Sequence, residues 1–449
     1  MSKLALNQIL LQRSNTTKAV KAIGIFAVFA LVLTFLPGSI TGLFDLPEKY
    51  VYYETSAATV TTAAQFQSAV TNNTTAITVN ASITSSKAAA FSSSSTFTIT
   101  VNSGYTLKVT SSDSTNTFTR TGSYTPNFVF QGAGTVYLQQ KRTDVAENAV
   151  YTPDSLTIKG DVNFKATTGC TGSANCISAG KISISTTGSV YIGCTSSAMT
   201  LVGQGGLYCN NTATNGISVS GTAKVYVAGA SYGLHTSSNG FGGISVGETA
   251  QVSATVTGNS GKAWDCYGAA KVSSGAKVTL NAKGATSYGF NVLNFNNLTI
   301  SGTSVVNVTA GKYPVYCQSS VYISGSASVT AHATDGASSN AFYMQGDYIS
   351  TTTGTVKATI SSPSSNTIYC TGKISITNGT HYYGCSSATG AVAGSWALTA
   401  TQTSEVSIVN ATVYAKGTVC GIRSISGDVE IFNSTIVAEA SNTSASYGI

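Results

Sequence analysis

Hydrophobic positions recur along most of the chain at intervals of about 26 residues. The clearest copy is Ile-Ser-Val-Ser-Gly-Thr-Ala-Lys-Val-Tyr-Val, which starts at Ile217. If Val219 is the reference position of this copy, the equivalent position in each other copy is β-branched or aromatic. These anchor positions are Val79, Val101, Phe130, Ile158, Ile184, Val219, Val246, Val272, Ile300, Ile323, Ile349, Ile376, Ile408 and Ile431. A fixed period of this length predicts a solenoid, in which each repeat buries its apolar face against its neighbours.

After many anchors, apolar residues follow at the sixth and eighth positions. Examples are Val136 with Leu138, Val190 with Ile192, Val225 with Val227, Val278 with Leu280, and Val306 with Val308. Alternation with a period of two predicts strands that have one inward and one outward face. The pattern therefore predicts an all-β chain that forms a parallel β-helix over residues 76–449, with about 14 coils.

One segment has a helical pattern instead. Ala63, Phe66 and Val70 share a face of the predicted helix Thr61–Val70, and Asn72-Asn73 provides a stop signal. An uncovered solenoid end exposes an unpaired strand edge and apolar core, so a short helix that covers it is expected. Residues 45–75 are therefore interpreted as a linker followed by a capping helix.

The helix and the first strand together read Thr-x-x-x-Phe-x-x-Ala-Val, then Ile-Thr-Val-Asn-x-x-Ile, and Ile-Ser-Gly and Tyr-Gly-Ile motifs recur downstream. This series over residues 61–449 resembles pectate-lyase-like right-handed parallel β-helices, especially repetitive cell-surface proteins. The resemblance implies a right-handed coil. Its members include adhesins, stalk-like structural proteins and polysaccharide-degrading enzymes, so it does not choose among these activities.

The first 44 residues have the features of a targeting segment. Four basic residues precede the uncharged run Ala22–Leu36: Lys3, Arg13, Lys18 and Lys21. This arrangement is typical of a signal peptide. The uncharged stretch extends through Phe44, a length that also suits a membrane anchor. Both alternatives place the repeats outside the cytosol, so we expect a secreted or cell-surface protein that contacts membrane only through this segment.

The net charge of +7 comes largely from that segment. Beyond residue 44, 19 basic residues (23 less the four above) face 16 acidic ones, a balance of +3. The charges form no basic stripe, which argues against nucleic acid as a partner.

Nine cysteines suit an oxidising compartment, although an odd number leaves at least one outside any disulfide. Cys170 with Cys176, and Cys194 with Cys209, are the candidate disulfide residues because they lie in longer connections. Cys266, Cys317 and Cys370 each lie six residues before an anchor, and we expect them to be small buried side chains. Since no Cys-x-x-Cys pair occurs, the sequence predicts neither a zinc site nor another metal or cofactor.

Residues that could support catalysis are scattered. A sugar-cleaving β-helix needs grouped carboxylates, and the sixteen acidic residues show no such grouping. The histidines, His235, His332 and His381, share no repeat position, and each is expected in a loop or at the surface. We therefore assign no catalytic residue and expect a protein that is not an enzyme. A polysaccharide lyase or hydrolase on the same fold is the alternative.

Two outward features are candidates for binding or modification. The seventh position after an anchor faces outward and is a tyrosine in three copies, so aligned rings could stack on sugars: Tyr137, Tyr191 and Tyr226. The equally simple alternative is that these tyrosines suit strands or pack against a loop or a neighbouring subunit. Candidate glycosylation sequons begin at Asn210, Asn297, Asn307, Asn378, Asn410 and Asn433.

The last repeat has no helix comparable to Thr61–Val70, so the C-terminal end is a candidate for self-association. The sequence thus predicts an exported, non-enzymatic β-solenoid that acts as a surface structural protein or adhesin. Its candidate partners are a carbohydrate or another cell-surface component. A filament or sheath subunit is a further alternative.

Overall fold

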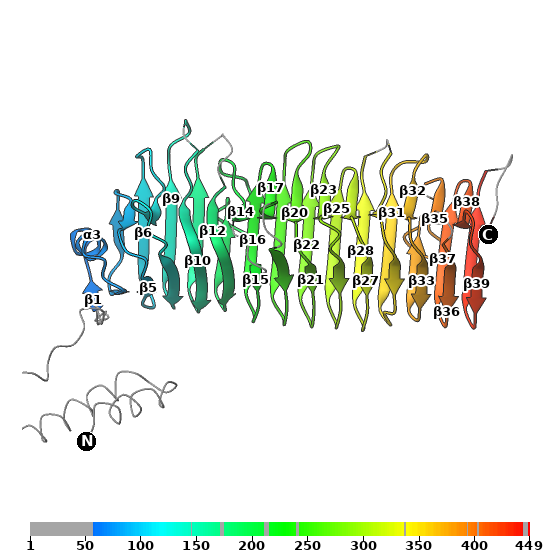
Figure 1. Ribbon diagram of the computed structural model, residues 1–449, viewed down its shortest axis with the longest axis horizontal. Coiled ribbons are helices and arrows are strands. Elements are labelled where there is room, and N and C mark those ends of the chain that lie inside the picture. Colours follow the sequence, from blue (N-terminus) through cyan, green and yellow to red (C-terminus); the bar gives the residue numbers. More distant parts are fainter. Residues whose placement is uncertain are drawn as a thin grey trace, which may run out of the picture. The chain divides into compact units, whose positions relative to one another are not determined.

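Three parallel β-sheets run along one axis and form the sides of a right-handed parallel β-helix. The computed structural model describes residues 57–449 apart from 145, 171–174, 211–214, 239–241, 336–337, 393, 402–403 and 443–447. These residues belong to the compact unit Thr55–Ile449. Figure 1 shows successive coils stacked side by side along this unit, in about 13 turns. The all-β parallel β-helix expected from the repeat is thus confirmed.

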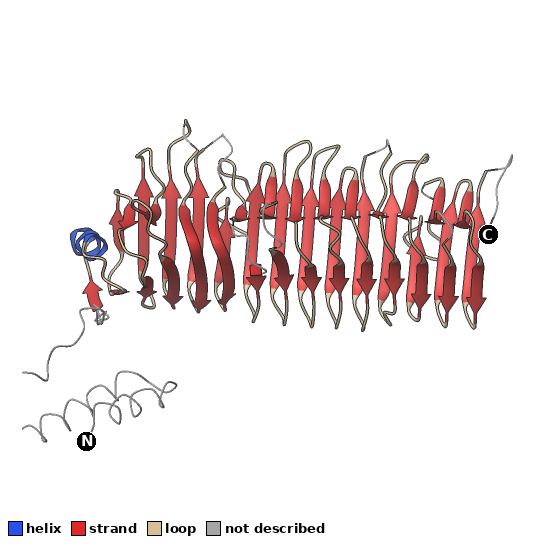
Figure 2. Ribbon diagram, in the orientation of Figure 1, coloured by secondary structure: helices blue, strands red, loops and turns tan. Residues whose placement is uncertain are grey.

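The sheets are built from strands of successive coils that lie side by side along the solenoid (Figure 2). The first sheet contains β1 (Ala57–Val60), β2 (Ala76–Val79), β5 (Thr96–Val101), β8 (Asn127–Gly132), β15 (Asn215–Val219), β18 (Gly243–Val246), β21 (Ala270–Val272), β24 (Leu298–Ile300), β27 (Val321–Ile323), β30 (Tyr348–Ser350), β33 (Ile374–Thr377), β36 (Val406–Val409) and β39 (Val429–Phe432). The second contains β3 (Ile83–Ser85), β6 (Thr106–Ser111), β9 (Thr135–Gln140), β11 (Asn163–Thr168), β13 (Ser189–Ile192), β16 (Lys224–Gly229), β19 (Gln251–Val256), β22 (Lys277–Ala282), β25 (Val305–Ala310), β28 (Ser328–Ala333), β31 (Thr355–Ile360), β34 (Thr380–Tyr383), β37 (Thr412–Gly417) and β40 (Thr435–Ala440).

The third sheet contains β4 (Ala89–Phe91), β7 (Phe118–Arg120), β14 (Leu207–Cys209), β17 (Tyr232–Thr236), β20 (Lys262–Cys266), β23 (Tyr288–Val292), β26 (Tyr313–Cys317), β29 (Phe342–Met344), β32 (Asn366–Cys370), β35 (Trp396–Ala400) and β38 (Cys420–Ser424). Two long strands, β10 (Val150–Gly160) and β12 (Ile177–Thr186), continue from the third sheet into the first. Hydrogen bonds consequently join these two sheets into one network, while the second sheet stays separate.

The predicted anchor positions align in the first sheet. Val219 pairs with Val246, and Val246 with Val272, and the row continues through Ile300 to Ile323. These side chains are buried. Stacking identical or similar apolar side chains from coil to coil removes their surface from water, which is the main source of stability for a solenoid.

The anchor assignment is wrong at three coils, those of Val79, Val101 and Ile349. Ser350, not Ile349, aligns with Ile323, so Ile349 faces outward and Ser350 is buried. This register follows from Tyr348, whose buried ring occupies the inward position opposite Val321. In an earlier coil, Phe130 aligns with Ile99 rather than with Val101.

The second sheet has the inward ladder that the sixth-position residues predicted. Val225, Val278, Val306 and Val329 lie in one row, with Val252 between the first two, and all are buried. The residue that follows each of them faces outward, because successive side chains along a strand point to opposite faces.

A capping helix covers the N-terminal end of the solenoid. It spans α3 (Ala63–Thr71), inside the range expected from the sequence apart from its last residue. Thr62 is its N-cap and forms a capping box with Gln65, and Phe66 is among its buried residues. Ala57–Val60, placed in the linker by the sequence, forms β1 and pairs with β2.

The candidate signal peptide or anchor in residues 1–44 lies outside the described residues. Within the described part of the chain, no helix has the length and apolar character needed to cross a membrane.

The last coil is less covered than the others. Ile408 and Ile431 are aligned anchors, but Ile408 is fully buried whereas Ile431 is 40% exposed. The neighbouring Phe432 is 69% exposed. The final strands therefore present apolar side chains to solvent among the described residues.

Candidate functional site

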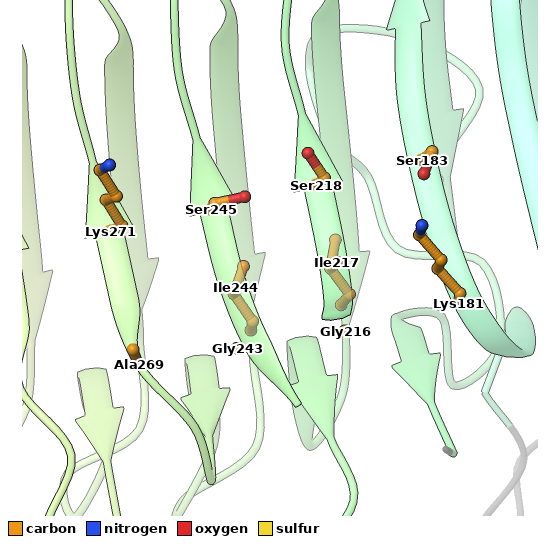
Figure 3. Close-up of a pocket in the computed structure, with 10 residues that line it drawn as sticks. All are labelled: Lys181, Ser183, Gly216, Ile217, Ser218, Gly243, Ile244, Ser245, Ala269 and Lys271. Atoms are coloured by element: carbon orange, nitrogen blue, oxygen red, sulfur yellow. The ribbon is translucent and has the colours of Figure 1, made fainter. Parts of the chain in front are cut away.

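A shallow trough crosses the outer face of the first sheet, with a volume of about 380 Å³. It extends over β12, β15, β18 and β21, which is three strand spacings or roughly 14 Å along the solenoid axis. Its lining consists of Lys181, Ser183, Gly216, Ile217, Ser218, Gly243, Ile244, Ser245, Ala269 and Lys271. Figure 3 shows these residues spread over the four neighbouring strands.

The trough is hollow because one of its rows lacks side chains. A Cβ atom added to Gly216 would lie 2.4 Å from the carbonyl oxygen of Gly243. At Gly243 it would lie 2.7 Å from the carbonyl oxygen of Ala269. The close approach of these strands therefore requires glycine at both positions, and no side chain fills the space above them.

A row of hydroxyl groups runs beside this glycine row. Ser183 aligns with Ser218, Ser218 with Ser245, and Ser245 with Lys271, so one polar side chain comes from each strand (Figure 3). Lys181 lies at the other end of the trough, on β12, and both lysines are exposed. Among the described residues, the lining contains two cations and no carboxylate, which favours an extended ligand that carries negative charge and hydroxyl groups.

The three tyrosines singled out from the sequence lie on the second sheet. Tyr137, Tyr191 and Tyr226 share one outward row, and Lys165 separates the first from the second. Tyr191 and Tyr226 are stacked, with ring centroids 5.2 Å apart and an interplanar angle of 11°. The Nζ atom of Lys165 lies over the Tyr191 ring, 5.4 Å from its centroid.

This stacking changes how the tyrosines can act. Parallel strands hold equivalent side chains about one strand spacing apart, so neighbouring rings cover each other's faces. The facing surfaces of Tyr191 and Tyr226 are therefore not open to a sugar ring, and the ring edges and hydroxyl groups face outward. Sugar binding by this row stays a prediction, but it would rely on hydrogen bonds more than on stacking.

The third sheet has a polar cluster that the sequence did not reveal. Asp265 is its centre, with a side chain only 1% exposed. Its Oδ2 atom lies 2.9 Å from Nδ1 of His235 and 3.6 Å from Nζ of Lys262, and Asn291 donates a hydrogen bond to Oδ1. The contact with His235 is close but lacks the geometry of a well-formed hydrogen bond.

Aromatic rings enclose the imidazole of this cluster. His235 stacks between Tyr208 and Tyr232, at centroid distances of 5.0 and 4.2 Å. A search of the sequence for alternating inward and outward positions does not find these residues. In β17, Tyr232 and His235 face outward, but the two residues between them are both buried.

The other histidines differ from each other. His332 lies on the outer side of β28, and its Nδ1 atom contacts the Thr359 hydroxyl at 2.8 Å. The expectation that His381 lies at the surface is wrong, since it is fully buried and occupies the valine row between Val356 and Val413.

A chain of hydrogen bonds keeps His381 in the core. Its Nε2 atom lies 2.9 Å from the Asn378 carbonyl oxygen, and its Nδ1 atom lies 3.0 Å from the Tyr383 hydroxyl. That hydroxyl is in turn 3.0 Å from the hydroxyl of Tyr348. Burial lowers the pKa of His381 to about 4, because the charged form would lose its hydration.

All nine cysteines are buried. Disulfides between the two candidate pairs, Cys170 with Cys176 and Cys194 with Cys209, stay a prediction. Cys266, Cys317 and Cys370 stack in one row of the third sheet on every second coil, as their spacing predicts. Burial raises the pKa of the Cys370 thiol to about 12, so this group stays protonated at neutral pH.

The candidate glycosylation residues are placed differently with respect to solvent. The Nδ2 atom of Asn433 donates to Oδ1 of Asn410 at 2.6 Å, and that of Asn210 donates to the Ser178 hydroxyl. Asn297 accepts a hydrogen bond from the Ser320 backbone. Asn307 is exposed, and Asn378 has a left-handed backbone. Glycosylation at these positions stays a prediction, for which Asn307 offers an exposed side chain on a regular strand.

Among the described residues, no group of three or more His, Cys, Asp or Glu side chains is arranged to hold a metal ion. Comparison with family models, with curated proteins and with solved structures found no match to this chain.

Proposed function

We propose that this protein is an exported, non-enzymatic β-solenoid that works as a surface structural protein or adhesin and binds an extended acidic glycan in the trough of its first sheet. The observation that carries the proposal is the lining: two lysines, a row of serines and no carboxylate along four consecutive strands. The signal-like N-terminal sequence supports export.

The trough suits binding more than bond cleavage. Hydrolysis of a glycosidic bond usually needs a pair of carboxyl groups, one of which donates a proton. In the part of the chain that the structure describes, the titratable groups that line the trough are Lys181 and Lys271. Lysines and hydroxyl groups can hold carboxylate or sulfate groups of a polymer without altering it, and a rigid sheet needs little reorganisation to do so.

Binding should depend on both lysines. We expect the Lys181→Ala/Lys271→Ala variant to bind acidic polysaccharides such as pectate or alginate about fivefold more weakly, since two exposed charge contacts together contribute about 1 kcal/mol. The matched control is Lys224→Ala/Lys277→Ala, which removes two exposed lysines from the second sheet. Equal weakening by both double variants would mean that only net charge matters, and the trough would be abandoned as the site.

A second candidate function rests on the cluster around Asp265. A buried carboxylate in contact with an imidazole is a common arrangement for acid–base chemistry, and Lys262 and Asn291 could hold an acidic sugar beside it. Release of reducing ends or unsaturated products from pectins, alginates or xylans, abolished by Asp265→Asn, would favour this sugar-cleaving activity over the binding protein.

A further inference from the structure

Five tyrosines on the third sheet form one contiguous group, here called the tyrosine cluster. They come from four consecutive coils, on strands β23, β26, β29 and β32, and all are half-buried. Its members are Tyr288, Tyr313, Tyr316, Tyr343 and Tyr369. Their rings thus contact one another and keep part of their surface open to solvent.

Tyr313 is the centre of this cluster. Its ring centroid lies 5.4 Å from that of Tyr288, 5.7 Å from that of Tyr316 and 5.5 Å from that of Tyr343. The ring planes are inclined by 51°, 44° and 50°. The remaining contacts extend the cluster along the axis, with Tyr343 stacked on both Tyr316 and Tyr369.

Isolated tyrosine pairs elsewhere have another geometry. Tyr382 and Tyr414 on the second sheet are almost parallel, at 6°, with centroids 5.1 Å apart. In such a pair each ring presents its face to the next. Around Tyr313 the rings are instead inclined to one another, so three neighbouring rings contact one central ring.

We propose that the tyrosine cluster is a site of oxidative cross-linking, at which Tyr313 forms a dityrosine bond with Tyr343 of the next coil. The oxidant is a peroxidase that uses hydrogen peroxide. The bond joins consecutive coils of a single chain. It gives this solenoid a covalent link between one coil and the next.

The reaction balances as follows in atoms and electrons. Each of the two phenols loses one electron and one proton to become a tyrosyl radical, whose unpaired electron is shared with the ring carbons next to the hydroxyl-bearing carbon. Two such carbons form the new carbon–carbon bond, and their hydrogens move to the oxygens, which restores both phenols. The two electrons and two protons reduce one hydrogen peroxide to two water molecules.

The closeness of the rings explains why the bond is expected in this place. Radicals formed anywhere in the cluster can exchange electrons with neighbouring rings in contact, so two oxidations bring two radicals into adjacent positions. Burial raises the pKa of Tyr313 and Tyr343, which keeps both phenols protonated until they are oxidised.

The test is to treat the full chain with a heme peroxidase and limiting hydrogen peroxide at low protein concentration. We expect dityrosine fluorescence in material that still migrates as a monomer. Peptide mapping should find the Tyr313 and Tyr343 peptides joined, with a mass lower by two hydrogen atoms. Tyr313→Phe keeps the ring and its packing but lacks the phenol, and it should reduce intrachain dityrosine at least fivefold.

The matched control is Tyr414→Phe, which alters a stacked pair outside the cluster and should leave the yield unchanged. Circular dichroism of both variants before oxidation checks that each is folded. Dityrosine found only between chains, a linkage that maps outside the cluster, or a yield that is equal in the two variants would each overturn the proposal.

Discussion

The buried histidine makes the stability of the last third of the solenoid dependent on pH. The pKa of His381 is about 4 in the folded chain, against 6.5 for an unperturbed histidine. Between these two values the unfolded chain binds more protons than the folded one. Stability is therefore complete above about pH 6.5 and decreases as the pH falls toward 4.

The size of the effect follows from the shift. A difference of about 2.5 pKa units corresponds to about 3.4 kcal/mol, all of which is lost below pH 4. At pH 5 the same two values give a loss of about 2 kcal/mol, and at pH 6 of about 0.8 kcal/mol. Because a solenoid can open coil by coil, the loss should concentrate on the coils that contain β31, β34 and β37.

Amide hydrogen exchange at pH 7 and pH 5, corrected for the intrinsic exchange rates, measures this local stability. The informative variant is His381→Val, which suits the row between Val356 and Val413 and has no titrating group. In this variant, the coils that contain β31, β34 and β37 should lose about 2 kcal/mol less local stability than in the wild type when the pH is lowered to 5. His332→Asn is the control, because it removes a histidine from the outer face and should leave the pH dependence of these coils intact. The reasoning is refuted if His381→Val and the wild type lose the same local stability.

Two further predictions concern the core and the last coil. Val278→Asp should destabilise the fold by about 3 kcal/mol or more, because it places an unpaired charge in a dry interior, whereas Thr279→Asp on the outer face should change the melting temperature little. Equal melting temperatures would disprove this register. The exposed Ile431 and Phe432 should promote association of chains through the last coil. Phe432→Lys should then reduce the sedimentation coefficient at high concentration and Tyr137→Lys should not, while a wild-type chain that remains monomeric would exclude this mode of association.

Much of the fold could be predicted from the sequence, because the repeat indicates both the length of each coil and the positions that face inward. The row from Val219 to Ile323 needed nothing more than the assumption that equivalent residues stack. Ser350 was missed because an apolar neighbour, Ile349, was the better match to the pattern. His381 was missed for a related reason: a polar side chain in a valine row is stable only through partners that become visible in three dimensions.

The candidate sites were harder to predict than the fold. The strands of the second sheet alternate between buried and outward residues around Tyr137, Tyr191 and Tyr226, so these outward tyrosines could be predicted from the sequence. In β17 and β26 of the third sheet, the outward residues are separated by two buried ones. A search for hydrophobic positions with a period of two therefore does not detect these outward residues. The trough depends on the absence of side chains at Gly216 and Gly243, and the significance of a glycine in a strand becomes clear only when its neighbour across the sheet is known.

These differences have one physical origin. Inside the solenoid, each side chain must fill the space left by the coils before and after it, so the inward rows vary little and are easy to recognise. Outside, neighbouring coils only need to avoid like charges and crowding, so rows of serine, tyrosine or lysine are equally compatible with the fold. The serine and lysine side chains of the trough and the tyrosine cluster are therefore not requirements of the architecture. They are the positions at which this chain can differ in activity from any other solenoid with the same core, and substitutions there should change binding or cross-linking while leaving the melting temperature almost unchanged.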